Sequence, residues 1–225
     1  MQKDSDMHRV AVFDFCETLA DFQTANAFVD FVRQNVKSVE ARLVNTVYVV
    51  LSKLQVIRLL NFATSHKHSI GKNLKLLQLR GMPRETIEAM ALRFHEERIK
   101  PHLIEATVER MEQLKKDGYE VGLSSGGYGV YLKHFAQDYK LDFVQCSEIG
   151  FRNGRCTGRL AGADCMREEK VRRLTQRFGN GDNAVAFSDS LSDLPLLEWA
   201  SQPVVVSKGK HQAWVEKYGF QEIIW

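Results

Sequence analysis

Features that would assign this chain to a specialised class are absent from its sequence. Its four cysteines form no C-x-x-C pair, so we expect reduced thiols instead of a disulfide framework or a zinc site. No stretch of about 18 uncharged apolar residues is present, which argues against a transmembrane helix. Residues 1–9 are polar and lack the apolar segment of a signal peptide. We therefore expect a cytoplasmic protein.

Acidic residues are missing from one long stretch, which has no Asp or Glu between Ala41 and Arg84. One interpretation is a helical hairpin with a cationic, solvated face. The other is a surface that attracts a phosphate- or carboxylate-bearing substrate into a cleft. For the second, the candidate side chains are Gln23, Thr24, Lys67, Lys72 and Arg80. The net charge of the whole chain, +3, is too small to indicate nucleic-acid binding.

Within that stretch, residues 43–63 are apolar on nearly every face of a helix, with interruptions at Lys53 and Arg58. Such a helix is typically buried between neighbours or at a homodimer contact. A position in a membrane interface is the less favoured alternative.

The apolar pattern predicts an α/β fold. An apolar run at residues 10–13 indicates a first strand, and a long helical excursion follows it. Helices and strands then alternate, which is typical of a Rossmann-like parallel sheet. We expect helices at residues 22–39, 84–99, 102–116, 130–139, 168–178 and 193–200. We expect strands at residues 120–124, 143–147, 184–187 and 203–206, and a hairpin or flap at the glycine-rich residues 148–163.

An acid stands at the end of the first strand, in the run Val-Ala-Val-Phe-Asp-Phe-Cys-Glu-Thr-Leu. Ligands of open α/β sheets bind at the carboxyl ends of strands, so Asp14 is placed for chemistry. The run resembles the first motif of the haloacid dehalogenase superfamily, Asp-x-Asp-x-Thr. Asp14 and Thr18 match it, but Cys16 replaces the second Asp.

Three later segments extend this resemblance. A strand that ends in Ser125-Gly126-Gly127 is similar to the second motif, in the form found in the phosphoserine phosphatase branch. Lys170, on a helix, resembles the third motif of subfamily IB. Ser-Asp-Ser-Leu-Ser-Asp, with Asp189 and Asp193, resembles the fourth. The resemblance implies a core of residues 1–21 and 102–225 and a helical cap at residues 22–101.

The resemblance also implies Mg²⁺, bound by the carboxylates of Asp14 and Asp189 and the backbone carbonyl of Cys16, with Asp193 acting behind them or through water. Asp14 would attack phosphorus to give an aspartyl-phosphate, and Lys170 would hold its charge. Substrate contacts fall to Ser125, Thr18, Gly126 and Gly127, and to Lys72 and Arg80 in the cap. The implied activity is a phosphatase of a small, anionic phosphorylated substrate.

Cys16 leaves a question open, because the missing Asp is the family's general acid and base. Glu17 could replace it, or the substrate could carry a good leaving group. The aspartyl-phosphate could instead pass to another acceptor, as in a phosphotransferase. The chain could also be a weakly active protein that binds a phosphorylated ligand. Cleavage of carbon–phosphorus or carbon–halogen bonds is a further alternative, since those branches also lack the second Asp.

Overall fold

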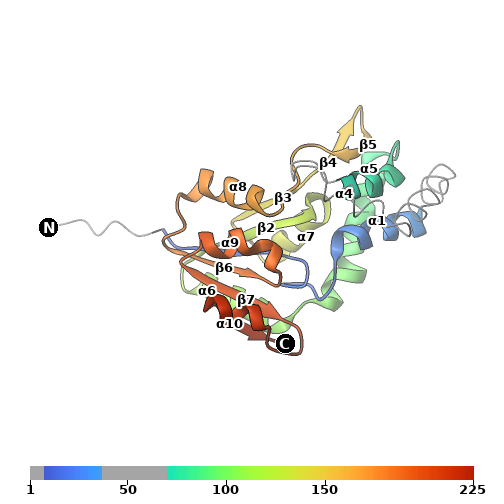
Figure 1. Ribbon diagram of the computed structural model, residues 1–225. Coiled ribbons are helices and arrows are strands. Elements are labelled where there is room, and N and C mark those ends of the chain that lie inside the picture. The colour runs from blue at the N-terminus through green and yellow to red at the C-terminus, as the bar shows by residue number, and fades with distance from the viewer. Residues whose placement is uncertain (1–7, 37–69) are drawn as a thin grey trace.

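The computed structural model describes residues 8–36 and 70–225 and contains one six-stranded sheet with the order β3-β2-β1-β6-β7-β8 (Figure 1). Every pair of neighbouring strands is parallel. The strands are β1 Val10–Phe13, β2 Glu120–Tyr128, β3 Phe143–Ser147, β6 Ala184–Ser188, β7 Gln202–Ser207 and β8 Gln221–Ile224. The predicted helix at residues 43–63 lies outside the described residues.

Helices cover both faces of the sheet, because successive residues of a strand point to opposite faces. Ala11 and Phe13 of β1 belong to the core that contains side chains of α6 and α7, whereas Val10 and Val12 pack with α8 and α9. These helices are α6 Glu105–Lys116, α7 Gly129–Asp138, α8 Glu168–Phe178 and α9 Leu194–Trp199. The predicted Rossmann-like α/β fold is confirmed.

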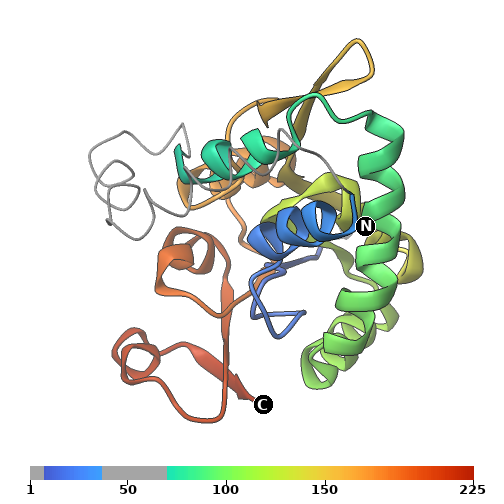
Figure 2. The ribbon, with the colours of Figure 1, turned by 90° about the vertical axis from the view of Figure 1, so that its right-hand side faces the viewer.

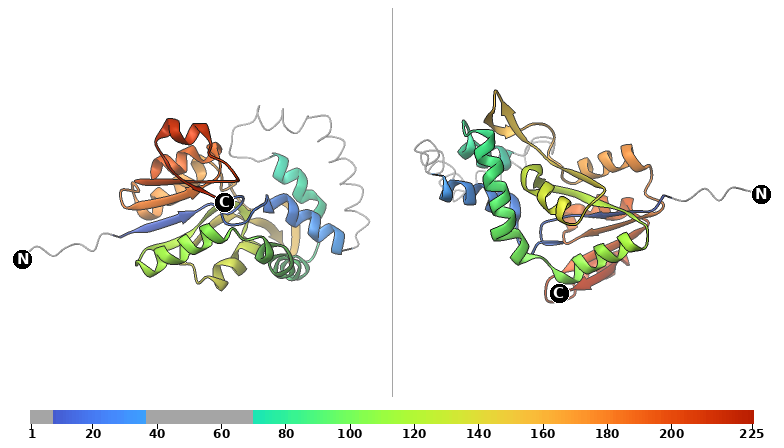
Figure 3. Two further views of the ribbon diagram at one scale, coloured as in Figure 1. Left: turned by 90° about the horizontal axis from the view of Figure 1, so that it is seen from below. Right: turned by 180° about the vertical axis from the view of Figure 1, so that it is seen from behind.

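A second group of elements lies at one end of the sheet (Figure 1), and Figure 2 shows it from that side. Its helices are α1 Thr24–Asn35, α4 Ile70–Leu76, η1 Leu77–Leu79, α5 Arg84–Phe94, η2 His95–Ile99 and η3 Lys100–His102. The hairpin of β4 Ile149–Arg152 and β5 Arg155–Leu160 joins this group, since the amide of Cys156 donates to the Met82 carbonyl at 2.9 Å. Helices α1 and α4 run side by side (Figure 3). The division into a core and a cap of residues 22–101 stays a prediction.

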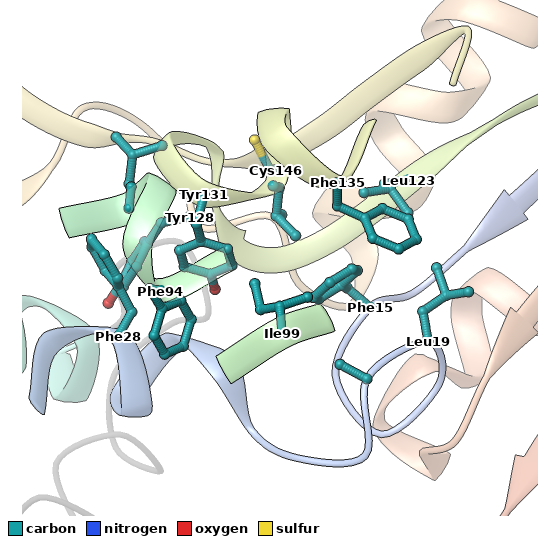
Figure 4. Packing of buried hydrophobic residues seen from close by; sticks show 14 of the residues in the cluster. Phe15, Leu19, Phe28, Phe94, Ile99, Leu123, Tyr128, Tyr131, Phe135 and Cys146 are labelled. Carbon is teal, nitrogen blue, oxygen red and sulfur yellow. The ribbon is translucent and has the colours of Figure 1, made fainter. Parts of the chain in front are cut away.

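Aromatic side chains join α1 and α5 to α7 (Figure 4). The ring of Phe94 lies 5.4 Å from the rings of both Phe28 and Tyr131, and all three side chains are buried. Edge-on and tilted pairs of this kind contribute about 0.5–1.5 kcal/mol each beyond the area that they bury. This cluster packs α1, which directly follows the Asp14 motif, against α7, which follows Ser125-Gly126-Gly127.

Several element boundaries differ from the prediction. Helix α1 begins at Thr24 and not at residue 22, because the backbone of Gln23 is extended; before it, the amide of Asp21 donates to the carbonyl of His102, the last residue of η3. The helix predicted from residue 102 begins at Glu105, after the short η3 helix. The sequence patterns missed α10 Ala213–Tyr218 and the edge strand β8. No helix in the described ranges is long and apolar enough to cross a membrane.

Candidate active site

Three neighbouring strands bring Asp14, Ser125 and Asp189 to one edge of the sheet. Phe13, the last residue of β1, pairs with Leu123 of β2 on one side and with Phe187 of β6 on the other. The amide of Asp14 continues this register and donates to the Phe187 carbonyl at 2.9 Å. Because the strands are parallel, their carboxyl ends meet at the point where the chain order reverses, which is where α/β folds bind ligands.

A cleft of about 160 Å³ opens at this edge. Most of the residues predicted for the site line it, together with Ala25 of α1. The lining residues are Asp14, Cys16, Glu17, Gln23, Ala25, Lys72, Ser125, Gly126, Met166, Lys170, Asp189, Ser190, Ser192 and Asp193. The tertiary structure therefore gathers five segments that are far apart in sequence around one small cavity.

Four of the predicted site residues that the structure describes, Thr18, Thr24, Arg80 and Gly127, do not line the cleft. Thr18 lies behind it, and its hydroxyl donates to Oδ1 of Asp189 over a long 3.4 Å. The amide of Gly127 donates to Oγ of Ser125 at 3.2 Å. Arg80 is exposed and directly follows η1. Lys67, another candidate, lies outside the described residues.

Lys170 is the buried cation of the cleft. Its ammonium group donates to Oδ1 of Asp14 at 2.9 Å and to Oδ2 of Asp193 at 2.5 Å. Burial alone would lower the pKa of Lys170, but the charges of Asp14 and Asp193 outweigh it and raise the pKa. Burial likewise raises the pKa of Asp14, and the ammonium group opposes that rise. The lysine thus serves as the counter-ion of two buried carboxylates.

Asp189 has a different environment. It forms no ion pair within the described residues, and burial and the charges of Asp14 and Glu17 raise its pKa to about 7. Carboxylates crowded in this way favour a bound cation, and Mg²⁺ prefers oxygen ligands. Asp193 is already held by Lys170 and by the hydroxyl of Ser188 at 2.8 Å. The donor set therefore fits a divalent cation near Asp14 and Asp189.

Cys16 is turned toward α1. Its Sγ lies 3.1 Å from the hydroxyl of Thr24, and the Thr24 hydroxyl is in turn 2.8 Å from the hydroxyl of Tyr131. The amide of Thr24, at the start of α1, also donates to Sγ at 3.4 Å. Burial and the nearby charge of Asp14 raise the pKa of the thiol to about 11. Cys16 is therefore a neutral group at neutral pH, and it cannot serve as a carboxylate would.

Glu17 is the acid that adjoins Cys16, and it lines the cleft. Its backbone has a positive φ of 55°, which is uncommon for a residue other than glycine. Its carboxylate accepts a hydrogen bond of 2.5 Å from the side-chain amide of Gln23. Glu17 thus reaches the cleft through a turn that the sequence pattern does not reveal.

Sequence reasoning assigned no role to Met166, which lines the cleft, or to Asp164, which contacts the cleft residue Lys72. Asp164 is buried, and its Oδ1 accepts from Lys72 at 2.5 Å and from the hydroxyl of Ser147 at 2.6 Å. Met166 lines the cleft two residues further on. Met166 stands within the segment that resembles the third motif, and Asp164 directly precedes that segment, but neither residue was given a role there. Their nearness in sequence to Lys170 is the one signal available.

Comparison with known proteins agrees with this geometry. The model of a family described as haloacid dehalogenase-like hydrolase matches residues 11–198. A phosphoserine phosphatase of Lactococcus lactis subsp. lactis is 32% identical over 103 residues, covering 44% of this chain and 48% of the relative. The chain spans between 38% and 58% of the first three curated relatives that it matches.

Solved structures share the fold. A crystal structure from Bordetella pertussis Tohama I, titled as a protein with unknown function, has a TM-score of 0.79 and 22% identity, covering 96% of this chain and 98% of that one. A structure titled as a phospho-aspartyl intermediate analogue of phosphoserine phosphatase has a TM-score of 0.61 and 18% identity, covering 97% of this chain and 94% of that one. At such identities the likeness establishes the fold alone.

Proposed function

The chain belongs to the haloacid dehalogenase-like hydrolase family, and from this premise we propose that it is a magnesium-dependent phosphatase of a small phosphorylated metabolite. The observation that carries the proposal is the carboxylate of Asp14, which lines the cleft and is bonded to the ammonium group of Lys170 at 2.9 Å. A carboxylate beside a buried cation, whose charge favours the ionised form, suits nucleophilic attack on phosphorus. Phosphoserine is the first ester to test, because the curated relatives bear the name of its phosphatase.

The metal would be held by the carboxylates of Asp14 and Asp189 and by the backbone carbonyl of Cys16. Asp193, whose Oδ2 already accepts from Lys170, would act through water. When bound, the ion supplies positive charge that neutralises phosphoryl oxygens.

The residues of the chain divide the remaining work. Asp14 forms the new bond to phosphorus as the bond to the leaving oxygen breaks, which gives an aspartyl-phosphate, and water later hydrolyses it. Lys170 balances the negative charge that spreads over the phosphoryl oxygens. The hydroxyl of Ser125, which lines the cleft, donates to one of these oxygens. The phosphate is thus surrounded by an anionic nucleophile on one side and donors on the others.

The leaving oxygen has no acid at the position of Cys16. Because the thiol is neutral and bonded to Thr24, we expect the best substrates to have leaving groups that need little protonation, such as acyl phosphates. The same observation favours a second candidate, a phosphotransferase, since without a base at position 16 the aspartyl-phosphate is hydrolysed slowly. Glu17 is the alternative acid at the cleft.

A phosphate-release screen over acyl phosphates, phosphoserine and simple alkyl phosphates tests the proposal, with wild type, Asp14→Asn and Cys16→Asp compared in Mg²⁺. Asp14→Asn should abolish release, and acid-quenched wild type should carry phosphate on Asp14 by mass spectrometry. The matched control is Asp21→Asn, which removes an acid paired with His102 outside the cleft and should keep the rate within about twofold. Full activity of Asp14→Asn would exclude the aspartyl-phosphate route.

Cys16→Asp tests the missing acid. General acid catalysis contributes about 10²–10⁴ in rate, so turnover of alkyl phosphates should rise by about 10² or more, whereas acyl phosphates should change little. An unchanged rate with alkyl phosphates would mean that another group, with Glu17 as the first candidate, supplies the proton. Glu17→Gln in the wild-type background then decides that point.

A further inference from the structure

The peptide group between Gly126 and Gly127 is held at both ends. Its carbonyl oxygen accepts a hydrogen bond of 2.7 Å from the ammonium group of Lys72. Its amide donates to Oγ of Ser125 at 3.2 Å. The peptide thus connects Lys72 of α4 to the hydroxyl of Ser125, which lines the cleft.

Lys72 is itself fixed by a buried ion pair. Its ammonium group lies 2.5 Å from Oδ1 of Asp164, and the side chains of Lys72 and Asp164 are only 14% and 3% exposed. The hydroxyl of Ser147 donates to the same Asp164 oxygen at 2.6 Å, and the amide of Cys165 donates to Ser147 at 3.0 Å. A buried pair is costly to desolvate and is a weak source of stability, so its position beside the Gly126 carbonyl calls for another role.

We propose that Lys72 is a positioning residue of the phosphoryl-transfer site that acts through Ser125. A cation on the carbonyl of a peptide polarises it and strengthens its amide as a donor. With one lone pair of Ser125 Oγ held by the Gly127 amide, the hydrogen of the hydroxyl is directed into the cleft, toward an incoming anion. This inference rests on the proposed function, because it assigns a role in the same site.

The contacts favour this role over direct substrate binding, which the sequence predicts for Lys72. The Gly126 carbonyl and the Asp164 carboxylate already accept from its ammonium group at 2.7 and 2.5 Å. A residue that bound the leaving group would matter for some substrates and not for others. A residue that acts through Ser125 matters for the phosphoryl group, which every substrate shares.

A double-mutant cycle distinguishes the two roles. The test variant combines Lys72→Met with Asp164→Asn, so that no buried charge is left unpaired. The matched control combines Lys75→Met with Asp30→Asn, which removes another ion pair of α4, of 2.6 Å, that does not contact the cleft. Each is made in the wild type and in Ser125→Ala, and kcat and KM are measured with p-nitrophenyl phosphate and phosphoserine.

We expect the Lys72/Asp164 variant to lose about 10- to 100-fold in kcat/KM with both substrates, as for the loss of a hydrogen bond to a charged group. In the Ser125→Ala background the further loss should shrink to about threefold or less. The Lys75/Asp30 control should keep wild-type kcat/KM in both backgrounds, and Lys72→Arg should recover most of the activity. An undiminished loss in the Ser125→Ala background, or a loss confined to one substrate, would overturn the proposal.

A readout without turnover keeps this test separate from that of the proposed function. In the metal-free protein, hydrogen exchange of the Gly127 amide should be about tenfold faster in the Lys72/Asp164 variant than in the wild type, and unchanged in the Lys75/Asp30 control. If the wild type released no phosphate but exchange at Gly127 were faster in the Lys72/Asp164 variant, the phosphatase proposal would fail. The coupling of Lys72 to this peptide would still stand. Unchanged exchange at Gly127 would overturn the inference even in an active enzyme.

Discussion

The ammonium nitrogen of Lys170 lies 2.9 Å from Oδ1 of Asp14, although the two residues are 156 positions apart in the chain. Both side chains are buried, at 3% and 10% exposed. Attraction between charges is much stronger in a buried site than in water, so each charge favours the charged form of the other group. This pair makes a strand-end acid into a candidate nucleophile.

Replacement of Lys170 should therefore lower stability as well as activity. Lys170→Met leaves Asp14 and Asp193 buried without their counter-ion, and the free energy of unfolding should fall by about 3–5 kcal/mol. Urea denaturation measures this change. Lys116→Met, at an exposed position of α6, should stay within about 0.5 kcal/mol of wild type. Equal stability of the two variants would contradict the buried ion pair.

The hydroxyl of Ser188 should stabilise the protein more than an ordinary hydroxyl does. It donates to the Asp193 carboxylate at 2.8 Å in a fully buried position, and hydrogen bonds to charged groups contribute about 1.5–3 kcal/mol. Ser188→Ala should lose that amount in thermal or urea unfolding. Ser201→Ala, which removes a bond to the neutral Ala184 carbonyl, should lose about 1 kcal/mol or less. A reversed order would argue against an ionised Asp193.

The two glycines after Ser125 should respond differently to alanine. A Cβ at Gly127 would lie 2.8 Å from the hydroxyl of the buried Tyr131, so Gly127→Ala should cost about 1–3 kcal/mol of stability. A Cβ at Gly126 would meet Nζ of Lys72 at 2.8 Å, the end of a long side chain, so Gly126→Ala should cost less stability but reduce activity.

Gly162 is the control for this pair, because a Cβ there meets nothing within 4 Å. We expect the urea midpoint to be highest for Gly162→Ala, near that of wild type, lower for Gly126→Ala and lowest for Gly127→Ala. A Gly162→Ala variant less stable than Gly127→Ala would show that backbone conformation, and not close packing, governs these positions.

Glu169 should make stability depend on pH in acid. Hydrogen bonds from Arg172 and then Arg173 lower its pKa from 4.5 to about 2. A lowered folded pKa means that the stabilisation is complete above about pH 4.5 and is lost as the pH falls toward 2. Glu169→Gln should cost about 1 kcal/mol at pH 7, since Arg172 is 61% exposed and the pair is screened, and the cost should shrink as the pH approaches 3.

Urea denaturation between pH 3 and 7 measures this dependence. Glu168→Gln is the control, because Glu168 is exposed in the same helical turn and forms no ion pair within the described part of the chain. A cost at Glu169 that stayed constant down to pH 3 would contradict the lowered pKa.

Much of the site could be predicted because its motifs adjoin buried strands. The apolar runs before Asp14, Ser125 and Asp189 identify central strands, and parallel strands place their carboxyl ends together. Periodicity was less informative at element ends. Helix α1 begins later than predicted because the backbone of Gln23 is extended. Periodicity gave no sign of β8, whose four residues are half-exposed at the sheet edge.

By itself, then, the sequence determined the α/β fold, the family and the acids that end the central strands, since local periodicity and short motifs record these. The tertiary structure alone decided which other side chains form hydrogen bonds and ion pairs around these acids. The contacts of Lys72 with Asp164, and of Cys16 with Thr24 and Tyr131, join elements that no local pattern relates. Hydrogen bonds and charge pairs act over a few ångströms in space, and neither sequence distance nor residue type predicts which groups the packed core brings that close.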